Sequence, residues 1–307
     1  MNQALGLALA GAAGYVLFVR WRIALVSRSA LTASSIGPHW LVRFCSWMLR
    51  SYSHLLGISI VSESGEGMDC DKSRRYIISW HPHGFLSWCP LFLLGDHALS
   101  GRPHGRPWFG SVAPILFKIP LMGECLTLMN GRPVDKRCLN DILNAGGSIA
   151  IQPGGVKEQA ATLDYQEQAI FSPNLGFIRL AIMHGVDLLP VYLFGENQLY
   201  KRVHGMEWLT KLFKLTTGMT LPVFLARFGI PVNCMFPLPN DIHIRWGAPV
   251  TIGPPEPEPS DERIEEVFSR YVAELRHIFD MHAERCLPPQ VAKRGLRIIR
   301  LDGKPVP

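Results

Sequence analysis

Tyr76-Ile77-Ile78-Ser79-Trp80-His81-Pro82-His83-Gly84 is the stretch of this sequence that decides the fold. Its first residues favour a buried strand, and the proline and glycine at its end predict an abrupt turn. The strand therefore delivers two imidazoles at its carboxyl end, the edge where open α/β sheets bind their ligands. Residues two apart in extended backbone point the same way, so His81 and His83 are expected to share one face.

Three roles are open to these two histidines. Neutral imidazole can take a proton from a hydroxyl, and general base catalysis of this kind is typically worth ~10²- to 10⁴-fold. Alternatively, the side chains only hydrogen-bond the end of the strand. A metal site would need a third ligand, and no nearby Cys-x-x-Cys or His-x-x-x-His spacing supplies one, so we expect no metal. The strand end beside proline and glycine favours catalysis.

Short apolar strands alternate with helices on the carboxyl side of this stretch. A helix is predicted over 135–145 and another over 177–184, and buried strands are predicted over 148–152 and 187–194. This alternation predicts an α/β fold with a mainly parallel mixed sheet flanked by helices.

The C-terminal third adds a strand and a long helix. Residues 242–252 predict a strand, or a strand pair, with a bend at Gly247, and Ser260 begins an amphipathic helix whose apolar stripe indicates packing and not chemistry. The expected domains are a linker over 62–75, a catalytic domain over 76–287 and a loosely ordered basic tail over 288–307.

The first 61 residues are expected to anchor the chain in a membrane. Ala4–Val19 is an apolar run followed by Arg20, Arg22 and Arg28, which predicts a transmembrane segment with the bulk of the chain in the cytosol. A cleaved signal peptide is the alternative, but no basic residue precedes the run. Aromatic and basic residues at helical spacing over 39–60 predict an interfacial helix or second membrane helix, with a core helix as the alternative.

Composition fits membrane contact better than nucleic-acid binding. Hydrophobic residues make up 48% of the chain and the net charge is +6, yet no nucleic-acid-binding motif is present. The seven cysteines are odd in number and scattered, and no Asn-x-Ser/Thr site occurs. A reducing location facing the cytosol is therefore expected.

Two further strand ends carry candidate site residues. Gly154-Gly155 follows the strand over 148–152 and can expose N–H groups to an oxyanion or phosphate, although an ordinary turn explains the pair equally well. Glu158 follows it at the same end of the sheet, and Glu196 and Asn197 follow the strand over 187–194. A carboxylate beside a neutral histidine would hold its tautomer and stabilise the imidazolium.

Taken together, these motifs resemble the diacylglycerol acyltransferase type 2 family, which includes monoacylglycerol, wax-ester and sterol acyltransferases. The motifs that carry the likeness are His81-Pro82-His83-Gly84, Gly154-Gly155 with Glu158, Gly176-Phe177-Ile178-Arg179-Leu180-Ala181, His184-Gly185, Asp187-Leu188-Leu189-Pro190-Val191-Tyr192, Phe194-Gly195-Glu196-Asn197, Tyr200-Lys201 and Gly247-Ala248-Pro249. The likeness covers most of the chain from about Tyr76 to the long helix. The chain departs from the family pattern at Gln152-Pro153 and Asn174-Leu175, which leaves acyl-CoA and acceptor preference open.

The resemblance implies a membrane enzyme of the endoplasmic reticulum, with a glycerolipid acyltransferase-like fold and its catalytic domain facing the cytosol. It implies transfer of a fatty acyl group from acyl-CoA to a neutral lipid hydroxyl, most readily that of diacylglycerol. The implied base is His83 first and His81 second, with Glu158 as the supporting carboxylate. The related His-x-x-x-x-Asp enzymes place an aspartate where this chain has Trp88, so an orienting acid is expected from elsewhere.

The expected partners are acyl-CoA as cosubstrate, a neutral lipid and a membrane, with no cofactor and no nucleic acid. A homo-oligomer is left open. Oxyanion donors are expected around Gly84, Gly154 and Gly155, and the candidate cations for the CoA phosphates are Arg132, Lys136, Arg137 and Lys157.

Three functions compete with acyl transfer. A hydrolase would need a Gly-x-Ser-x-Gly motif, which the sequence lacks. A cysteine acyl-enzyme would use Cys89, which lies in an apolar run. A catalytically silent lipid-binding protein would have no use for an intact set of His81, His83 and Glu158.

Overall fold

The structure is a computed structural model. It describes residues 38–306 apart from 64–70, 72, 101–107, 218–221 and 232–234, together with scattered positions between 6 and 21. Half of the residues of the predicted transmembrane segment over 4–19 therefore lie outside the described residues. Among the helices that are described, none combines the length and the apolar character needed to cross a membrane.

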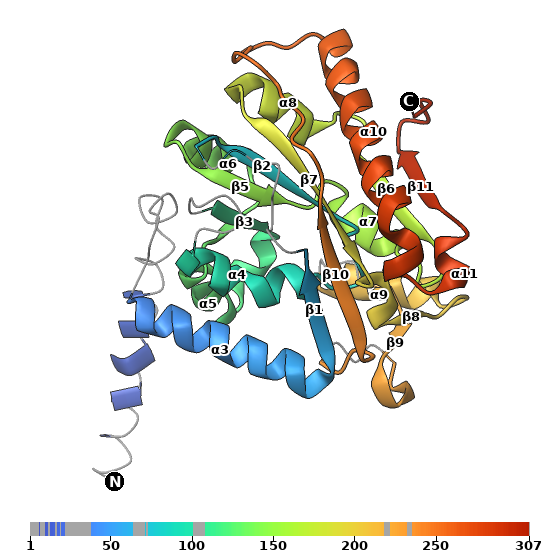
Figure 1. The fold of residues 1–307 in the computed structure, drawn as a ribbon. Helices are drawn as coiled ribbons and strands as arrows, with labels where there is room; N and C mark the ends of the chain where they lie inside the picture. Colours follow the sequence, from blue (N-terminus) through green and yellow to red (C-terminus); the bar gives the residue numbers. More distant parts are fainter. Residues whose placement is uncertain are drawn as a thin grey trace.

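A seven-stranded sheet forms the centre of the molecule (Figure 1). Across the sheet the strands are β1 (Ile58–Ser62), β10 (Asn240–Trp246), β7 (Asp187–Phe194), β2 (Tyr76–His81), β5 (Ser148–Ile151), β3 (Trp108–Val112) and β4 (Gly131–Pro133). The five strands from β7 to β4 are parallel, whereas β10 is antiparallel to β7 and β1 is parallel to β10. The predicted mixed, mainly parallel sheet is confirmed.

Helices cover both faces of this sheet, which is why β2 and β7 are buried along their whole length. One core lies beneath α6 (Lys136–Asn144), α8 (Gly176–His184) and α10 (Asp261–Cys286). The other lies beneath α3 (His39–Leu56), α4 (Trp88–Ser100) and α5 (Met122–Leu128). The remaining described elements are η1 (Pro114–Lys118), α7 (Gly155–Ala161), β6 (Glu167–Phe171), η2 (Asn197–Leu199), β8 (Lys201–Arg202), α9 (Glu207–Thr217), β9 (Phe224–Leu225), η3 (Arg227–Gly229), α11 (Pro289–Ala292) and β11 (Leu296–Arg300).

Local capping chemistry sets the helix boundaries that the sequence predicted. The side chain of Asp135 accepts the backbone N–H of Cys138 at 2.9 Å and begins α6, and Ser260 accepts that of Arg263 at 3.2 Å and begins α10. Gly185 ends α8 in the left-handed conformation. The strand over 187–194 has its predicted bounds.

Two predicted boundaries need correction. The predicted anchor over 1–61 and linker over 62–75 divide β1, which pairs with β10 and belongs to the central sheet. The prediction of a loosely ordered tail over 288–307 is also wrong, because β11 pairs in parallel with β6. The basic residues of this strand suggested an exposed tail. In the structure, however, Arg300 is buried, lies 5.1 Å from the Phe268 ring and forms ion pairs with Glu265 and Asp302.

Candidate active site

The carboxyl ends of β2, β5 and β7 bring together the motifs that the sequence singled out. The parallel pairing of β2 with both neighbours places His81, Gln152 and the segment 195–197 at one edge of the sheet. Helix α7 begins at Gly155, a short turn after β5, and carries Glu158 to the same edge. The predicted convergence of these strand ends is therefore observed.

The Glu158 carboxylate contacts His81, His83 and Ile170 at the centre of the site. The Glu158 side chain is 2% exposed. Oε1 accepts the backbone N–H of His83 at 2.6 Å and Oε2 accepts that of Ile170 at 2.9 Å. Oε2 also lies 3.6 Å from Nδ1 of His81, too far for a hydrogen bond but close enough for a strong electrostatic contact. The carboxylate thus fixes the backbone, and not the ring, of His83.

Gly154 makes the position of Glu158 possible. A Cβ atom at residue 154 would lie 2.1 Å from Oε2 of Glu158 and 2.4 Å from its Cβ. Only a residue without a side chain leaves room for the carboxylate to fold back over the start of α7. The glycine pair therefore serves close packing first, whatever it donates to a substrate.

His81 is fully buried and is held from the far side by Tyr271 of α10. Its Nε2 lies 3.0 Å from the Tyr271 hydroxyl, and its ring packs 5.3 Å from that of Phe171. Burial raises the pKa of Tyr271, so the hydroxyl stays protonated and donates to Nε2. Both ring nitrogens of His81 therefore face protein groups, Nε2 toward Tyr271 and Nδ1 toward Glu158.

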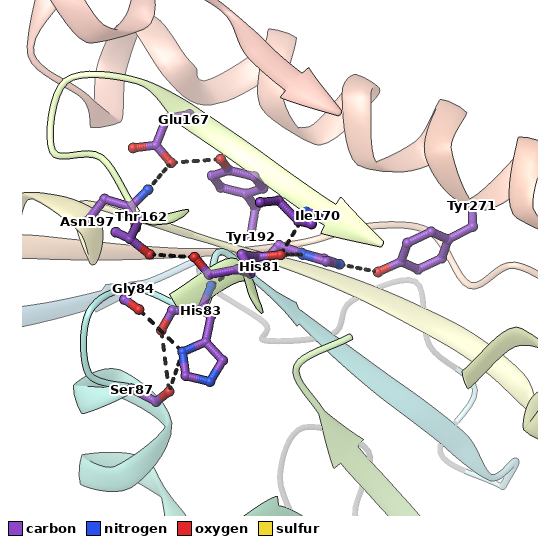
Figure 2. Close-up of polar contacts among 11 residues, drawn as sticks. His81, His83, Gly84, Ser87, Thr162, Glu167, Ile170, Tyr192, Asn197 and Tyr271 are labelled. Atoms are coloured by element: carbon purple, nitrogen blue, oxygen red, sulfur yellow. Dashed lines mark hydrogen bonds and ion pairs between the residues drawn. The ribbon is translucent and has the colours of Figure 1, made fainter. Parts of the chain in front are cut away.

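His83 is half-buried, and its ring faces away from His81 (Figure 2). Its Nδ1 lies 3.3 Å from the Gly84 carbonyl oxygen. Because a carbonyl only accepts, Nδ1 carries the proton and Nε2 carries the lone pair. Burial lowers the pKa of His83 below its ordinary value of 6.5, against the opposing pull of Glu158, so the imidazole is neutral near pH 7.

Glu196 lies beneath Gly84 and caps α4. Its Oε1 accepts the backbone N–H of Trp88 at 2.6 Å and that of Cys89 at 3.3 Å. Gly84 has a φ of +69°, and a Cβ there would lie 2.9 Å from Cγ of Glu196. The expectation that Glu196 supports a histidine ring is corrected: it fixes the turn that follows the two histidines.

Asn197 belongs to a buried cluster around Glu167 of β6. Oε2 of Glu167 accepts from the Tyr192 hydroxyl at 2.8 Å and from Nδ2 of Asn197 at 3.0 Å, and Oε1 accepts from Nε2 of Gln198 at 3.0 Å. Burial raises the pKa of Glu167 despite these donors. The cluster ties β6 to the end of β7.

The basic candidates for the CoA phosphates divide into buried and exposed groups. Arg132 has no exposed surface, and its Nη1 donates to the carbonyls of Thr127 and Gly131 at 3.1 and 2.8 Å. Burial lowers the pKa of Arg132 to about 10, and the predicted phosphate role does not fit this position. Arg137 and Lys157 are exposed in the first turns of α6 and α7 and stay candidates.

Comparison of the sequence with known proteins identifies the family of this chain. Residues 38–293 match the family model described as diacylglycerol acyltransferase. The chain belongs to the diacylglycerol acyltransferase family. This confirms the resemblance inferred from the motifs, and acyl transfer is the activity that membership implies.

Individual relatives agree with the family assignment. Diacylglycerol O-acyltransferase 2B of Umbelopsis ramanniana is 28% identical over 76% of this chain and 70% of its own. For 2-acylglycerol O-acyltransferase 1 and diacylglycerol O-acyltransferase 2 of Bos taurus the identities are 33% and 30%, over 70% and 68% of this chain and 67% and 61% of theirs. A solved 1-acyl-sn-glycerophosphate acyltransferase of Thermotoga maritima aligns with a TM-score of 0.45 and 19% identity over 85% of this chain and 89% of its own.

Sequence patterns missed three residues that take part in the polar contacts at this edge of the sheet. Tyr271 lies in the apolar stripe of α10 and so resembles a packing residue, although a tyrosine hydroxyl inside a core needs a partner. Glu167 starts a short polar strand that no periodicity revealed. Ser87, which touches the His83 ring, lies four residues after it in a segment classed only as apolar.

Glu196 makes the stability of this protein depend on pH. Burial raises its pKa from 4.5 to about 8. Because the folded carboxyl binds its proton more tightly than the unfolded one, its contribution is fully present below pH 4.5 and is lost as the pH rises through about 8. We expect the melting temperature to fall between about pH 5 and pH 8, and to fall less in Glu196→Gln. Equal declines in thermal melts of the two proteins would contradict this.

Proposed function

We propose that the protein transfers a fatty acyl group from acyl-CoA to the free hydroxyl of diacylglycerol, forming triacylglycerol and CoA. The observation that carries the proposal is the geometry of His83: Nδ1 faces the Gly84 carbonyl oxygen, which only accepts, and Nε2 has no hydrogen bond from the described part of the chain. A half-buried neutral imidazole of this kind is a general base for an alcohol.

The reaction needs no acyl-enzyme. Nε2 of His83 takes the proton of the acceptor hydroxyl as its oxygen attacks the thioester carbonyl. The tetrahedral intermediate then collapses, the C–S bond breaks, and the imidazolium returns the proton to the CoA sulfur. Cys89, the alternative nucleophile, is fully buried, so no substrate carbonyl reaches its thiol.

Backbone N–H groups near His83 are proposed to stabilise the oxyanion. The first N–H groups of α4 are taken by Glu196, so that helix terminus is not available. The N–H groups of Gly84 and Gly154 are the candidates that remain at this edge, and each donor would be worth ~10²- to 10³-fold. Arg137 and Lys157 are proposed to meet the CoA phosphates.

Monoacylglycerol is the second candidate acceptor. Of the two Bos taurus relatives, the 2-acylglycerol O-acyltransferase is the more similar, at 33% against 30% identity. Wax alcohols and sterols, the other acceptors implied by the motif resemblance, lack a comparable observation. The two proposed acceptors, diacylglycerol and monoacylglycerol, therefore differ by one acyl chain.

Membrane association at the endoplasmic reticulum, with the site facing the cytosol, is also proposed. One face of α3 exposes apolar and aromatic side chains, including Trp40, Trp47 and Leu55 at 68%, 62% and 75%. Tyr52 of the same helix donates to the Met235 carbonyl, and the Leu56 carbonyl accepts from Arg227, whose neighbour Phe228 is 76% exposed. Apolar surface of this extent beside arginines is typical of an interfacial helix. Release of the full chain by alkaline carbonate would contradict an integral anchor.

A product assay tests the proposed reaction. Labelled oleoyl-CoA and a panel of acceptors are supplied to membranes that contain the protein, and the labelled lipids are separated. We expect labelled triacylglycerol from diacylglycerol. Labelled diacylglycerol alone, formed from monoacylglycerol, would favour the second candidate, and no labelled ester with any acceptor would contradict acyl transfer.

The proposed base predicts how activity depends on pH. His83 must be unprotonated to accept a proton, and burial lowers its pKa below 6.5. kcat/KM should therefore rise with pH to a plateau, with the midpoint of the acid limb below 6.5. A midpoint near 7.5 or above, measured with saturating and subsaturating oleoyl-CoA, would exclude His83 in this state as the base.

A further inference from the structure

Ser87 meets the ring of the proposed base from the start of α4. Its Oγ donates to Oε1 of Gln152 at 2.6 Å and lies 3.5 Å from Nδ1 of His83. Ser87 directly precedes α4, and Gln152 directly follows β5. One hydroxyl thus connects the end of β5 with the imidazole at the end of β2 (Figure 2 shows the Ser87 side).

The direction of these hydrogen bonds follows from counting protons. A serine hydroxyl has one proton and two lone pairs. The Gln152 oxygen, at 2.6 Å, is a closer acceptor for that proton than the His83 carbonyl at 3.3 Å. Ser87 therefore presents a lone pair to Nδ1–H, which it shares with the Gly84 carbonyl. Contacts of this length commonly shorten when substrate binds.

Neither of the two carboxylates near the histidine motif, Glu158 and Glu196, hydrogen-bonds the ring of His83. Glu158 binds the backbone N–H of His83, and Glu196 binds the backbone of α4. Within the described residues, the hydrogen bonds of the His83 ring go to neutral groups, Gly84 and Ser87. The acid that commonly orients a histidine base is thus replaced by a hydroxyl and an amide.

We propose that Ser87, held by Gln152, is the positioning residue that keeps His83 in the Nδ1–H tautomer with Nε2 toward the acceptor hydroxyl. The proposal rests on the proposed role of His83 as general base. It assigns to two residues outside the recognised motifs a function in the chemical step.

Two variants of Ser87 in the full chain test the assignment. Ser87→Ala removes the lone pair and should lower kcat by ~10- to 100-fold with little change in KM, because a loosened base loses orientation and not substrate contacts. Ser87→Asp places a carboxylate beside the imidazole and should move the acid limb of kcat/KM to higher pH by about 1 unit or more. Aspartate is favoured at the residue before a helix, so the fold should tolerate it.

Matched variants separate positioning from packing. Gln152→Leu should reproduce the effect of Ser87→Ala, and Gln152→Glu, which still accepts from Ser87, should restore part of kcat. Ser73→Ala, an exposed serine that bonds Asp71 before the amino end of β2, should leave both kcat and the pH profile unchanged. Melting temperatures of all variants are measured alongside.

An acid limb that does not move in Ser87→Asp overturns the proposal even if kcat falls, because that fall then has only a structural origin. Wild-type kcat in Ser87→Ala overturns it as well. Failure of the proposed base is a separate result: full activity in His83→Gln would remove the base assignment whatever the Ser87 variants do.

Discussion

His83→Gln is expected to lower kcat for acyl transfer by ~10²- to 10⁴-fold, the contribution of a positioned general base. Glutamine approximates the size and polarity of histidine but cannot take a proton from an alcohol. The backbone N–H of residue 83 still donates to Glu158, so the turn stays in place. The rate of ester formation from labelled oleoyl-CoA measures the loss.

His184→Gln is the matched control for this loss. His184 is the last residue of α8 and is also partly buried. Its Nε2 lies 2.7 Å from Oδ1 of Asn140 on α6, away from the strand ends that form the site. Its replacement should leave kcat within about twofold, the range of a surface change that touches no catalytic group. Comparable losses in the two variants would mean that the effect at His83 is general destabilisation.

Gly154→Ala is expected to have the second-largest effect. The new Cβ would occupy the position of the Glu158 carboxylate, 2.1 Å from Oε2, and would displace it from the N–H groups of His83 and Ile170. A shift of about 1 Å in a catalytic group costs on the order of 10²-fold in rate, and orphaned buried N–H groups cost roughly 1–3 kcal/mol each in stability. Both kcat and melting temperature should fall.

Gly155→Ala, one residue further on, distinguishes this mechanism from ordinary glycine strain. Gly155 has a φ of +50°, but a Cβ there meets nothing within 4 Å. Alanine at this position should lower the free energy of unfolding by about 1–2 kcal/mol, because the left-handed conformation strains a residue that has a Cβ. It should leave kcat near the wild-type value. Equal activity of the two alanine variants would contradict the packing role given to Gly154.

The sequence predicted those parts of the fold where one local signal dominated. Asp135 and Ser260 were recognisable as helix caps, and the apolar strands at 76 and 187 were too continuous to miss. Short or polar strands such as Gly131–Pro133 and Glu167–Phe171 lacked any periodicity and were missed. Their partners come from distant parts of the chain, and pairing of that kind leaves no local pattern.

The same limit applies inside the site. Motif spacing was enough to place His83, Glu158 and the glycines at one edge of the sheet. It could not separate the roles of the two histidines, because Tyr271, which buries His81, lies 190 residues further along the chain. Nor could it show that Glu158 contacts the backbone of His83 and that Ser87 contacts its ring.

One measurement tests the central claim most directly: purified full-length protein and His83→Gln are compared for esterification of diacylglycerol by labelled oleoyl-CoA, with free CoA and labelled triacylglycerol both quantified. We expect one CoA released per ester formed by the wild type, no labelled protein, and a loss of both products by ~10²-fold or more in the variant. Equal rates of ester formation by the two proteins, or labelled acyl groups bound to the protein itself, would contradict it.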